Sequence, residues 1–351
     1  MFIIKLGEIC FIKRGSSPRP ISKWLKKEGL MWAKISDLNG NFLRQTKEFI
    51  DFSWEAKGLL GSYGDLFITN SATPGIPFIQ LSKKVAYHDG FLSIKCNENV
   101  IIKKYLFYKL ILDRPKLIKM GNGAIFINLS SEILKNWKIE VPSIKIQNQI
   151  IGIIEPIENL ENKLINIKNK LIELLINLYN YSNNNQISFN SVIKILISKY
   201  ENQINYFATN AVGEMQIDYK KIINLSEKIP SRANISPWKD SFIFSKLAGE
   251  NKIFYFKDKP KEVFSTGFFN FKTEHHDHIL GFMLSNDFKK QKEYLATGTT
   301  MQGINNSSLE LIKLNKSSLK SSIMTTTLYD LENNLIKIKK LKAKLINLLL
   351  K

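Results

Sequence analysis

Two short groups of residues in this chain have the side chains and spacing of a metal or catalytic site. The run 275–278 is His-His-Asp-His, but adjacent ligands on one short loop rarely converge on one ion, and no second cluster occurs elsewhere. His88 beside Asp89 has the order of a general base and its orienting carboxylate, but no nucleophile can be assigned to the pair. We therefore expect no metal site, a solvated loop at 275–278 and a structural role for His88.

A nuclease-like pattern, an acidic residue two positions before a lysine, occurs at Glu250-Asn251-Lys252, downstream of Asp240. The same spacing recurs at Glu55-Ala56-Lys57, Glu161-Asn162-Lys163, Asp218-Tyr219-Lys220 and Asp287-Phe288-Lys289. A pattern so frequent in a lysine-rich chain is no evidence of a nuclease. The sequence also lacks a Walker A loop, a Gly-x-Gly-x-x-Gly motif and the Asn/Asp-Pro-Pro-aromatic motif of amino-methyltransferases. These observations favour a binding protein over an enzyme.

The charge balance indicates what such a protein would bind. Lysine and arginine number 51 against 31 aspartates and glutamates, which gives a formal net charge of +20 and a pI near 9.6. An excess of this size favours nucleic acid, because neutralised phosphates supply affinity for any sequence. A coding bias toward A and T is the alternative cause, since it raises lysine, asparagine and isoleucine together.

The few arginines carry more information than the lysines, because such a bias acts against them. Arg14 and Arg19 flank a Gly-Ser-Ser-Pro loop, and Arg232 lies in a Pro-Ser-Arg-Ala-Asn segment. Arginine can form two parallel hydrogen bonds to guanine, whereas lysine mainly supplies charge. These loops are therefore candidates for reading DNA bases.

The elements that would position these loops occur twice in the chain. Residues 160–168 and 331–339 are identical at seven of nine positions, at an offset of 171. Two further pairs of segments correspond at an offset of 177, namely 121–134 with 298–311 and 89–95 with 266–272. This period is far too long for a solenoid, so each copy should be a whole globular domain followed by a long helix.

Heptad spacing predicts the two long helices. In the first, leucine or isoleucine recurs four and three residues apart at Leu160, Leu164, Ile167, Leu171, Leu174 and Leu178. The second has the same spacing at Leu331, Leu335, Ile338, Leu345 and Leu349, with Lys342 at the position between Ile338 and Leu345. We predict that these residues form the seam of an intramolecular, antiparallel coiled coil. Two ordinary core helices are the alternative.

Short β-like runs, helical segments and polar loops predict an α+β fold for each globular domain, with a pseudo-twofold internal repeat of the whole. The Asn-rich stretch 179–185 should end the first long helix, and helical spacing after it suggests a short helix. The predicted segments are a globular domain at 1–144, a long helix at 145–182, a linker with a short helix at 183–204, a second globular domain at 205–322 and a long helix at 323–351.

The sequence predicts a cytoplasmic protein with no membrane partner. Its longest apolar runs are too short to span a bilayer, and residues 1–8 lack the pattern of a signal peptide. Cys10 and Cys96 cannot form a disulfide framework, so we expect free thiols in a reducing compartment.

The motifs of the first domain resemble a target-recognition domain of the specificity (S) subunits of type I restriction–modification systems. They are Lys5-Leu6-Gly7-Glu8-Ile9-Cys10 and segments 14–19, 31–38, 69–75, 88–92 and 121–130, followed by Val141-Pro142 and Gln149-Ile150. The second domain resembles a recognition domain of another sequence class in Thr209-Asn210 and segments 230–234, 245–250 and 298–302. Together with the domain–helix–domain–helix order, the resemblance covers essentially the whole chain.

This resemblance implies a DNA-binding subunit that has no catalytic activity. Each recognition domain would read one half of a bipartite target in double-stranded DNA, and the paired helices would set the distance between the halves. Two methylation (M) subunits would bring S-adenosylmethionine and methylate adenine at N6, and restriction (R) subunits would bring ATP- and Mg-dependent cleavage. No cofactor would be bound by this chain. The alternative is a non-catalytic coiled-coil adaptor, or a degenerate DNA-binding protein without an active methyltransferase partner.

The residues predicted to contact DNA are polar side chains of the loops, because base edges are read by such groups while apolar strand residues pack. In the first domain they are Lys13, Arg14, Ser16, Ser17, Arg19, Lys34, Ser36, Asp37, Asn70, Ser71, Thr73 and Asn122. In the second they are Asn210, Ser231, Arg232, Asn234, Ser245, Lys246, Thr299, Thr300 and Gln302. Several of them also lie in strong turn sequences, which is the alternative explanation for their type.

Overall fold

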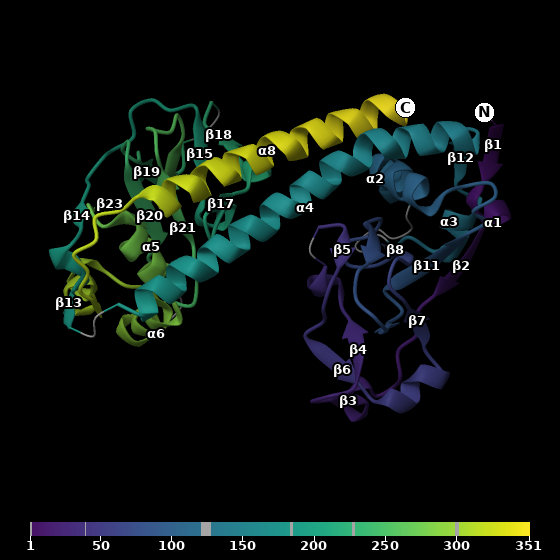
Figure 1. Cartoon of the computed structure of the whole chain (residues 1–351), viewed down its shortest axis with the longest axis horizontal. Helices are drawn as coiled ribbons and strands as arrows, with labels where there is room; N and C mark the ends of the chain where they lie inside the picture. Colours follow the sequence, from purple (N-terminus) through teal and green to yellow (C-terminus); the bar gives the residue numbers. More distant parts are fainter. Residues whose placement is uncertain (1, 39, 121–127, 183–184, 227–228, 299–301) are drawn as a thin grey trace. The chain divides into compact units, whose positions relative to one another are not determined.

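The computed structural model describes residues 2–38, 40–120, 128–182, 185–226, 229–298 and 302–351. The contacts within it divide the chain into two compact units. Unit 1 contains residues 1–158 and 340–351, and unit 2 contains residues 159–339. Each unit therefore combines one globular domain with a part of each long helix (Figure 1).

Unit 1 is built on two five-stranded sheets, with the strand orders β3-β6-β4-β10-β7 and β2-β11-β8-β9-β5, and β1 pairs with β12. Apolar residues fill the central strands, so every residue of β8 and β9 is buried. The strands are β1 (Phe2–Lys5), β2 (Cys10–Arg14), β3 (Leu25–Lys26), β4 (Leu30–Ala33), β5 (Phe42–Leu43), β6 (Glu48–Ile50), β7 (Leu59–Gly61), β8 (Leu66–Thr69), β9 (Pro77–Gln80), β10 (Val85–Tyr87), β11 (Phe91–Cys96) and β12 (Lys138–Val141).

Helices cover the apolar side of these sheets in unit 1. α2 (Lys103–Lys119) buries Leu106, Leu110 and Leu117 in the same cluster as Ile68 of β8 and Leu92 of β11. The Ser130 hydroxyl accepts the N–H of Ile133 at 3.1 Å and so fixes the start of α3. The remaining short helices are α1 (Leu6–Ile9), α3 (Ser131–Asn136), and the 3-10 turns Ile21–Lys23, Ile35–Asp37 and Phe52–Ala56.

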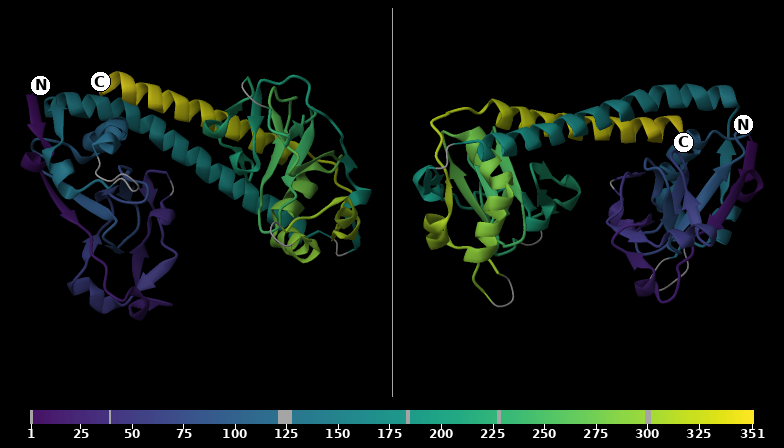
Figure 2. Two further views of the ribbon diagram at one scale, coloured as in Figure 1. Left: turned by 180° about the vertical axis from the view of Figure 1, so that it is seen from behind. Right: turned by 60° about the horizontal axis from the view of Figure 1, so that its bottom comes forward.

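Unit 2 has two four-stranded sheets, with the orders β14-β23-β20-β21 and β18-β15-β22-β19, and two strand pairs, β13-β24 and β16-β17. The first turns of α8 (Ile323–Leu349) lie against these strands (Figures 1 and 2). Tyr329 of α8 packs on Phe254 and Tyr255 of β21, with ring centroids 6.1 Å apart in both cases. The strands are β13 (Gln186–Ser188), β14 (Lys194–Ile195), β15 (Asn205–Phe207), β16 (Val212–Gly213), β17 (Gln216–Ile217), β18 (Ile223–Asn224), β19 (Ala233–Ile235), β20 (Ser241–Ser245), β21 (Ile253–Phe256), β22 (Val263–Ser265), β23 (Phe268–Lys272) and β24 (Lys313–Asn315). The short helices are α5 (His276–Leu284), α6 (Asn286–Leu295), α7 (Asn306–Leu311), and the 3-10 turns Phe189–Ser191, Thr209–Ala211 and Tyr219–Lys221.

The two units repeat one another strand by strand. The order β2-β11-β8-β9 of unit 1 corresponds to β14-β23-β20-β21 of unit 2, and β6-β4-β10-β7 corresponds to β18-β15-β22-β19. The senses of pairing also agree, since β4 and β10 are parallel and so are β15 and β22. The predicted α+β class is therefore confirmed, and the shared strand order is consistent with the predicted internal repeat.

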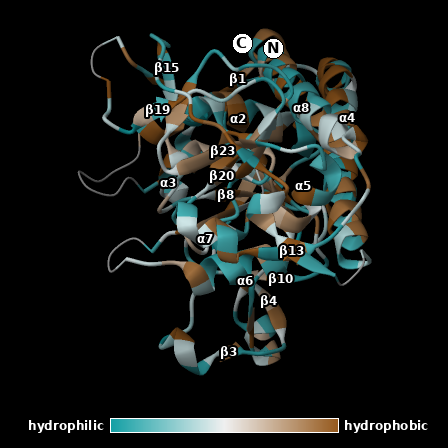
Figure 3. Ribbon diagram, turned by 90° about the vertical axis from the view of Figure 1, so that its left-hand side faces the viewer, coloured by the Kyte–Doolittle hydropathy of each residue, from teal (hydrophilic) through white to brown (hydrophobic). Residues whose placement is uncertain are grey.

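The long helices have nearly the predicted bounds, with α4 at Ile144–Asn180 and α8 at Ile323–Leu349. The predicted seam of α4 is wrong in part, because Leu160, Ile167, Leu174 and Leu178 are 47%, 50%, 48% and 49% exposed. Figure 3 shows apolar turns interspersed with polar ones along both helices. Two apolar stripes with heptad spacing therefore lie side by side on α4. The stripe with Leu160, Ile167 and Leu174 was predicted to be buried and is exposed, whereas the stripe beside it is buried. The other predicted seam residues are buried or partly buried, namely Leu164, Leu171, Leu331, Leu335, Ile338 and Leu345.

The buried stripe of α4 contains charged residues that the sequence pattern places in solvent. In unit 2, the Lys168 ammonium lies 2.7 Å from the Glu332 carboxylate of α8 and donates to the Met215 carbonyl at 2.8 Å. In unit 1, buried Glu158 is bound by Lys104 and accepts the Tyr108 hydroxyl proton at 3.2 Å. Lys168 and Glu158 each have a partner of opposite charge. A charged residue can therefore occupy this buried face, where the heptad pattern alone would suggest leucine.

The linker predicted at 183–204 differs from the structure. Beyond a 3-10 turn, the described residues 185–204 form no helix; β13 pairs with β24 and β14 pairs with β23. Phe189 between these strands is fully buried in the core of unit 2. The helical spacing of Ile193, Ile197 and Tyr200 therefore has no structural counterpart, and Ile197 is 84% exposed.

Among the described residues, no helix has the length and apolar character needed to cross a membrane. Cys10 and Cys96 are both free thiols, as expected, and they face each other on β2 and β11. The Cys10 thiol donates to the Cys96 sulfur at 3.9 Å.

Candidate nucleic-acid interface

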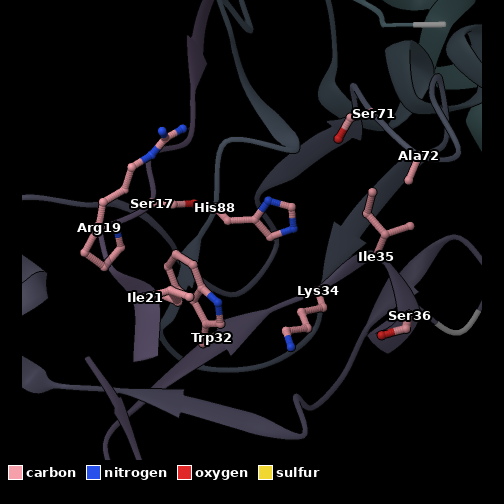
Figure 4. A pocket seen from close by; sticks show the side chains of 11 residues that line it. Ser17, Arg19, Ile21, Trp32, Lys34, Ile35, Ser36, Ser71, Ala72 and His88 are labelled. Carbon is pink, nitrogen blue, oxygen red and sulfur yellow. The ribbon is translucent and has the colours of Figure 1, made fainter. Parts of the chain in front are cut away.

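Four segments of unit 1 converge on one pocket with a volume of about 480 Å³. The segments lie at or after the ends of the strands β2, β4, β8 and β10. Figure 4 shows the side chains that line the pocket. The lining residues are Ser17, Pro18, Arg19 and Ile21; Trp32, Lys34, Ile35 and Ser36; Ser71 and Ala72; and His88. Five of the residues predicted to contact DNA therefore meet here: Ser17, Arg19, Lys34, Ser36 and Ser71.

Backbone hydrogen bonds hold these loops together. The Gly15 N–H donates to the Phe91 carbonyl at 3.0 Å, and the Ser16 N–H donates to the Tyr87 carbonyl at 3.2 Å. A side chain on Gly15 would place its Cβ 2.0 Å from the His88 carbonyl oxygen, so the close approach of the two loops requires glycine. The Asn70 N–H closes the third loop on the Gly90 carbonyl at 2.9 Å.

His88 occupies the middle of the pocket. Its Nδ1 accepts the N–H of Gly90 at 2.8 Å, and its ring lies 4.8 Å from the Phe91 ring and 6.1 Å from the Trp32 ring. Burial lowers the pKa of His88 from its ordinary value of 6.5, although the nearby Asp89 carboxylate opposes the shift. The imidazole is therefore neutral at physiological pH.

The charges beside the pocket are paired. Arg14 donates from Nε to the Asp89 carbonyl at 2.8 Å, and the Ser17 hydroxyl donates to the Asp89 carboxylate at 2.9 Å. Burial opposes ionisation of Asp89, but the Ser17 hydrogen bond and the Arg14 charge hold its pKa below the usual value. Lys34 forms an ion pair with Glu48. Arg19 remains exposed at the rim.

The corresponding loops of unit 2 meet around the turn 265–267. The Thr266 N–H donates to the Arg232 carbonyl at 2.8 Å, and the Lys246 N–H donates to the Gly267 carbonyl at 2.8 Å. A Cβ on Gly267 would lie 2.8 Å from the methyl group of Thr209, so the loop containing Asn210 also reaches this turn. Loops that are far apart in the sequence thus form one polar surface in each unit.

Two lysines of unit 2 lie near this surface, Lys246 partly exposed and Lys292 buried. Lys246 Nζ lies 4.8 Å from the centre of the Phe269 ring, and burial lowers its pKa. Lys292 is buried and donates to the Glu250 carbonyl at 3.0 Å; burial lowers its pKa to about 8. Lys246 is thus partly available at the surface, whereas Lys292 supports the fold beneath it.

The structure leaves most predicted DNA contacts accessible. Fully or mostly exposed are Lys13, Arg14, Arg19, Lys34, Ser36, Thr73, Asn210, Ser231, Arg232, Asn234 and Gln302. Partly buried are Ser16, Ser17, Asp37, Ser71 and Lys246. Asn122, Thr299 and Thr300 lie outside the described residues.

Two residues predicted to contact DNA are buried, and the side chain of a third forms a hydrogen bond within its own turn. Asn70 is 4% exposed and donates from its side chain to the Asp89 carbonyl at 3.0 Å. Ser245 is fully buried, and its hydroxyl accepts the Leu247 N–H at 3.2 Å. The Asp37 carboxylate accepts the Lys34 N–H at 2.8 Å. These side chains shape the loops, as the turn-forming alternative predicted, and Asn70 and Ser245 have no accessible surface with which to read a base.

Trp32 and His88 line the pocket although neither was predicted to contact DNA. Trp32 is buried in β4, and His88 was expected to be only structural. The available sequence signal was the position of His88 directly after a strand and before Asp89-Gly90, a turn sequence.

The histidine run 275–278 is not a solvated loop. His276 and Asp277 are 8% and 3% exposed and belong to α5. The Asp277 carboxylate accepts the N–H of Thr325 at 2.8 Å at the start of α8, and His276 pairs with Asp240 at 2.9 Å. No group of three potential metal ligands occurs among the residues that the structure describes.

Residues 2–174 match a family model described as the type I restriction modification DNA specificity domain. Among solved structures, the chain is similar to the type I restriction-modification system S subunit from M. genitalium, with 12% identity, a TM-score of 0.58, and coverage of 100% of this chain and 96% of that one. It also matches the HsdS subunit from Thermoanaerobacter tengcongensis, with 12% identity, a TM-score of 0.36 and coverage of 99% and 94%. A third match is a chain from a structure on complex assembly and conformational transition of the type I R-M system. It has 13% identity and a TM-score of 0.43, and the match covers 100% of this chain and 97% of that one. The first of these similarities supports a common fold.

Proposed function

We propose that the chain, whose residues 2–174 match the type I restriction modification DNA specificity domain, is an S subunit that recognises a bipartite DNA sequence. Unit 1 reads one half-site and unit 2 reads the other. The observation that carries the proposal is the repetition of one strand topology, with exposed polar loops gathered at the same strand ends in both units. The formal charge of +20 supplies affinity for the phosphates.

Methylation of adenine at N6 is assigned to partner M subunits, two for each copy of this chain, which bring S-adenosylmethionine. R subunits, where they join, bring ATP and Mg-dependent cleavage. This chain contributes recognition and binds no cofactor. In the part of the chain that the structure describes, no group of three potential metal ligands occurs, and the polar loops there can select bases.

The exposed stripe of α4 is the proposed docking surface for the M subunits. In unit 1 it contains Ile146 and Ile153, which are 46% and 47% exposed, and in unit 2 it continues with Leu160, Ile167 and Leu174. These residues recur every seven positions, so they lie on one face of the helix. A regular apolar face left in solvent is unfavourable unless another protein covers it, and apolar helices pack on such a face as in a coiled coil.

The paired long helices are proposed to set the distance between the half-sites. α4 has 37 residues, which at about 1.5 Å per residue corresponds to about 55 Å. This length is compatible with two half-sites about one helical turn of DNA apart, roughly 34 Å. We propose that α4 and α8 form the antiparallel coiled coil that maintains this distance.

The test of the function is to co-express the chain with the M subunit encoded beside it and to map N6-methyladenine by long-read sequencing. We expect one new motif with two short specified halves separated by a fixed gap. A stable complex that methylates no sequence would contradict the proposal and favour the adaptor alternative.

The distance-setting role has its own test. Inserting seven residues into α4 and seven into α8, at positions that face each other, should lengthen the gap and leave both half-sites unchanged. An insertion of the same length in the exposed loop 257–262 is the control. An unchanged gap in the helix variant would refute this role.

A further inference from the structure

The turn that leads into β11 in unit 1 has a structural equivalent in unit 2. In unit 1, the N–H of Gly90 donates to Nδ1 of His88 at 2.8 Å; in unit 2, the N–H of Gly267 donates to the hydroxyl of Ser265 at 3.1 Å. Both bonds join a side chain to the N–H two residues later, at the same point of the same topology. The turn therefore needs a short acceptor at this position, and histidine meets the requirement with only one of its two ring nitrogens.

The second ring nitrogen of His88 is a donor held in a fixed direction. Because Nδ1 accepts a hydrogen bond, the proton of the neutral imidazole is on Nε2. The Phe91 and Trp32 rings on either side restrict rotation of the imidazole. Figure 4 shows the ring projecting into the space between Ser17, Trp32, Lys34 and Ser71.

The cationic side chains of the pocket are also donors, since Arg19 and Lys34 can only donate, whereas its serine hydroxyls can donate or accept. No carboxylate belongs to its lining among the described residues. Asp89, outside the lining, is bound by Ser17 and Arg14, and Oε1 of Glu48 is bound by Lys34. The lining therefore has more donors than acceptors among its side chains and favours a ligand group that presents hydrogen-bond acceptors.

The base edges of the DNA major groove differ in this property. Guanine presents two acceptors, N7 and O6; adenine and thymine present one each, and cytosine presents only its N4 amino donor. His88 Nε2–H and a donating Ser71 hydroxyl supply two donors, which matches guanine. If the Ser71 hydroxyl accepted instead, the pair would match N7 and the N6 amino group of adenine. The excess of donors in the lining favours guanine. In unit 2 the equivalent Ser265 is 3% exposed, so its side chain supports the turn and reaches no ligand.

We propose that His88 is a specificity-determining residue, whose Nε2–H donates to an acceptor on the edge of a guanine in the half-site read by unit 1. Ser71 supplies the second donor. This inference rests on the proposed function, because it assigns one base contact within the DNA interface of unit 1.

Two substitutions separate the turn from the base contact. In His88→Asn, the side-chain oxygen replaces Nδ1 as acceptor for Gly90, so the turn is kept while the Nε2 donor is lost. In His88→Gln, an amide donor reaches the position of Nε2, while the turn acceptor is lost. Ser265→Ala, which removes the equivalent acceptor from unit 2, is the matched control.

The experiment measures binding of the purified chain–M-subunit complex to duplexes that vary one base pair at a time across the methylated motif. For H88N we expect the preference at one guanine of the unit 1 half-site to fall by roughly 5- to 150-fold, with every other position unchanged. H88Q should retain part of this preference, and S265A should leave the unit 1 half-site unaffected. In the wild type, binding should weaken when that guanine is replaced by 7-deazaguanine, which lacks N7, or by 2-aminopurine, which lacks O6. H88N should not respond to the analogue that lacks the atom to which His88 donates.

Three results would overturn the inference. An equal loss for all sequences would make His88 a phosphate contact, an unchanged profile would make it structural, and an altered preference for adenine or thymine would reject guanine. Thermal melting of each variant without DNA identifies loss of folding. If the wild-type complex prefers no sequence, the proposed function fails first, whereas a specific wild type with a normal H88N profile refutes this inference alone.

Discussion

Unit 1 and unit 2 have the same strand order, but the side chains at equivalent positions differ in what they do. At the turn before β11, His88 combines an acceptor for the backbone with a donor that faces the pocket; before β23, the buried Ser265 provides the acceptor alone. The backbone geometry is therefore common to both, and the chemical character of the surface is not. This difference is what a protein that reads two unlike half-sites requires.

The two units also differ in how they hold the long helices. In unit 1, Ile150 and Ile154 of α4 share one apolar cluster with Ile346 of α8 and Leu350 just beyond it. In unit 2, the buried Lys168–Glu332 pair lies between the helices. Apolar contacts tolerate small shifts along the helix axis, whereas a buried ion pair is satisfied at one register only. The unit 2 end should therefore define the register of the pair.

The largest expected effect comes from breaking that ion pair. Lys168→Ala leaves the Glu332 carboxylate buried without its cation, which should lower the free energy of unfolding of unit 2 by about 3–5 kcal/mol. Urea denaturation of the full chain, followed by hydrogen exchange to locate the loss, measures this effect. The double variant K168M/E332L removes both charges and should recover most of the stability. If single and double variants lose the same amount, the ion pair is not the cause.

The next largest effect concerns the exposed arginines of the two units. Arg232→Ala should reduce discrimination at one base pair of the unit 2 half-site by about 1–3 kcal/mol, because a bidentate base contact is lost. Arg19→Ala is the reciprocal variant and should act on the unit 1 half-site alone. Binding measured on single-base variants of the motif checks both. Uniform weakening over all sequences would instead assign these side chains to phosphates.

A smaller effect is the pH dependence of stability, with one histidine in each unit. Burial lowers the pKa of His88 and of His278 below the ordinary value of 6.5. The unfolded chain then binds more protons than the folded one below pH 6.5, so the free energy of unfolding should decrease as the pH falls from 6.5 toward the folded pKa values. Lys292 of unit 2, whose pKa burial lowers to about 8, should add a separate rise in the free energy of unfolding above about pH 8. H88N should remove this slope from unit 1 and keep it in unit 2, as followed by hydrogen exchange between pH 5 and 8. An unaltered slope in unit 1 would show that His88 is not its source.

The smallest effect is confined to unit 1, since both cysteines belong to it. The hydrogen bond from Cys10 and the charge of Lys103 lower the pKa of Cys96, so iodoacetamide at neutral pH should label Cys96 before Cys10. Cys10→Ala should slow the labelling of Cys96, because the hydrogen bond is lost. Mass spectrometry of time points measures both rates. Equal rates for the two thiols would contradict this assignment.

Local patterns in the sequence predicted the repeat, the long helices and the polar loops. The position of α4 was predictable because heptad spacing and helix length are properties of consecutive residues. The buried face was not, since Leu160, Ile167 and Leu174 have the same spacing as the stripe beside them. That stripe is buried through Lys168 and Glu158, whose partners Glu332 and Lys104 are distant in the sequence.

The candidate site likewise has features that the sequence predicted and features that it did not. The polar and arginine-containing loops follow from residue type alone, and most of them are accessible. Asn70 and Ser245 were indistinguishable from accessible loop residues until their hydrogen bonds to neighbouring loops were known. The short helix predicted at 183–204 was wrong, because strands β13 and β14 pair with segments far along the chain and this pairing outweighs local helical spacing.

The sequence by itself determined the duplicated α+β plan, the helix lengths and the basic, polar character of the loops, since each depends on residues that are near one another in the chain. Only the tertiary structure decided which helix face is buried and that His88 lies in one pocket with the cationic side chains of Arg19 and Lys34. Both depend on strand ends and helices that meet across long sequence separations. Their contacts are set by packing and hydrogen bonding of the whole unit, which no local pattern contains.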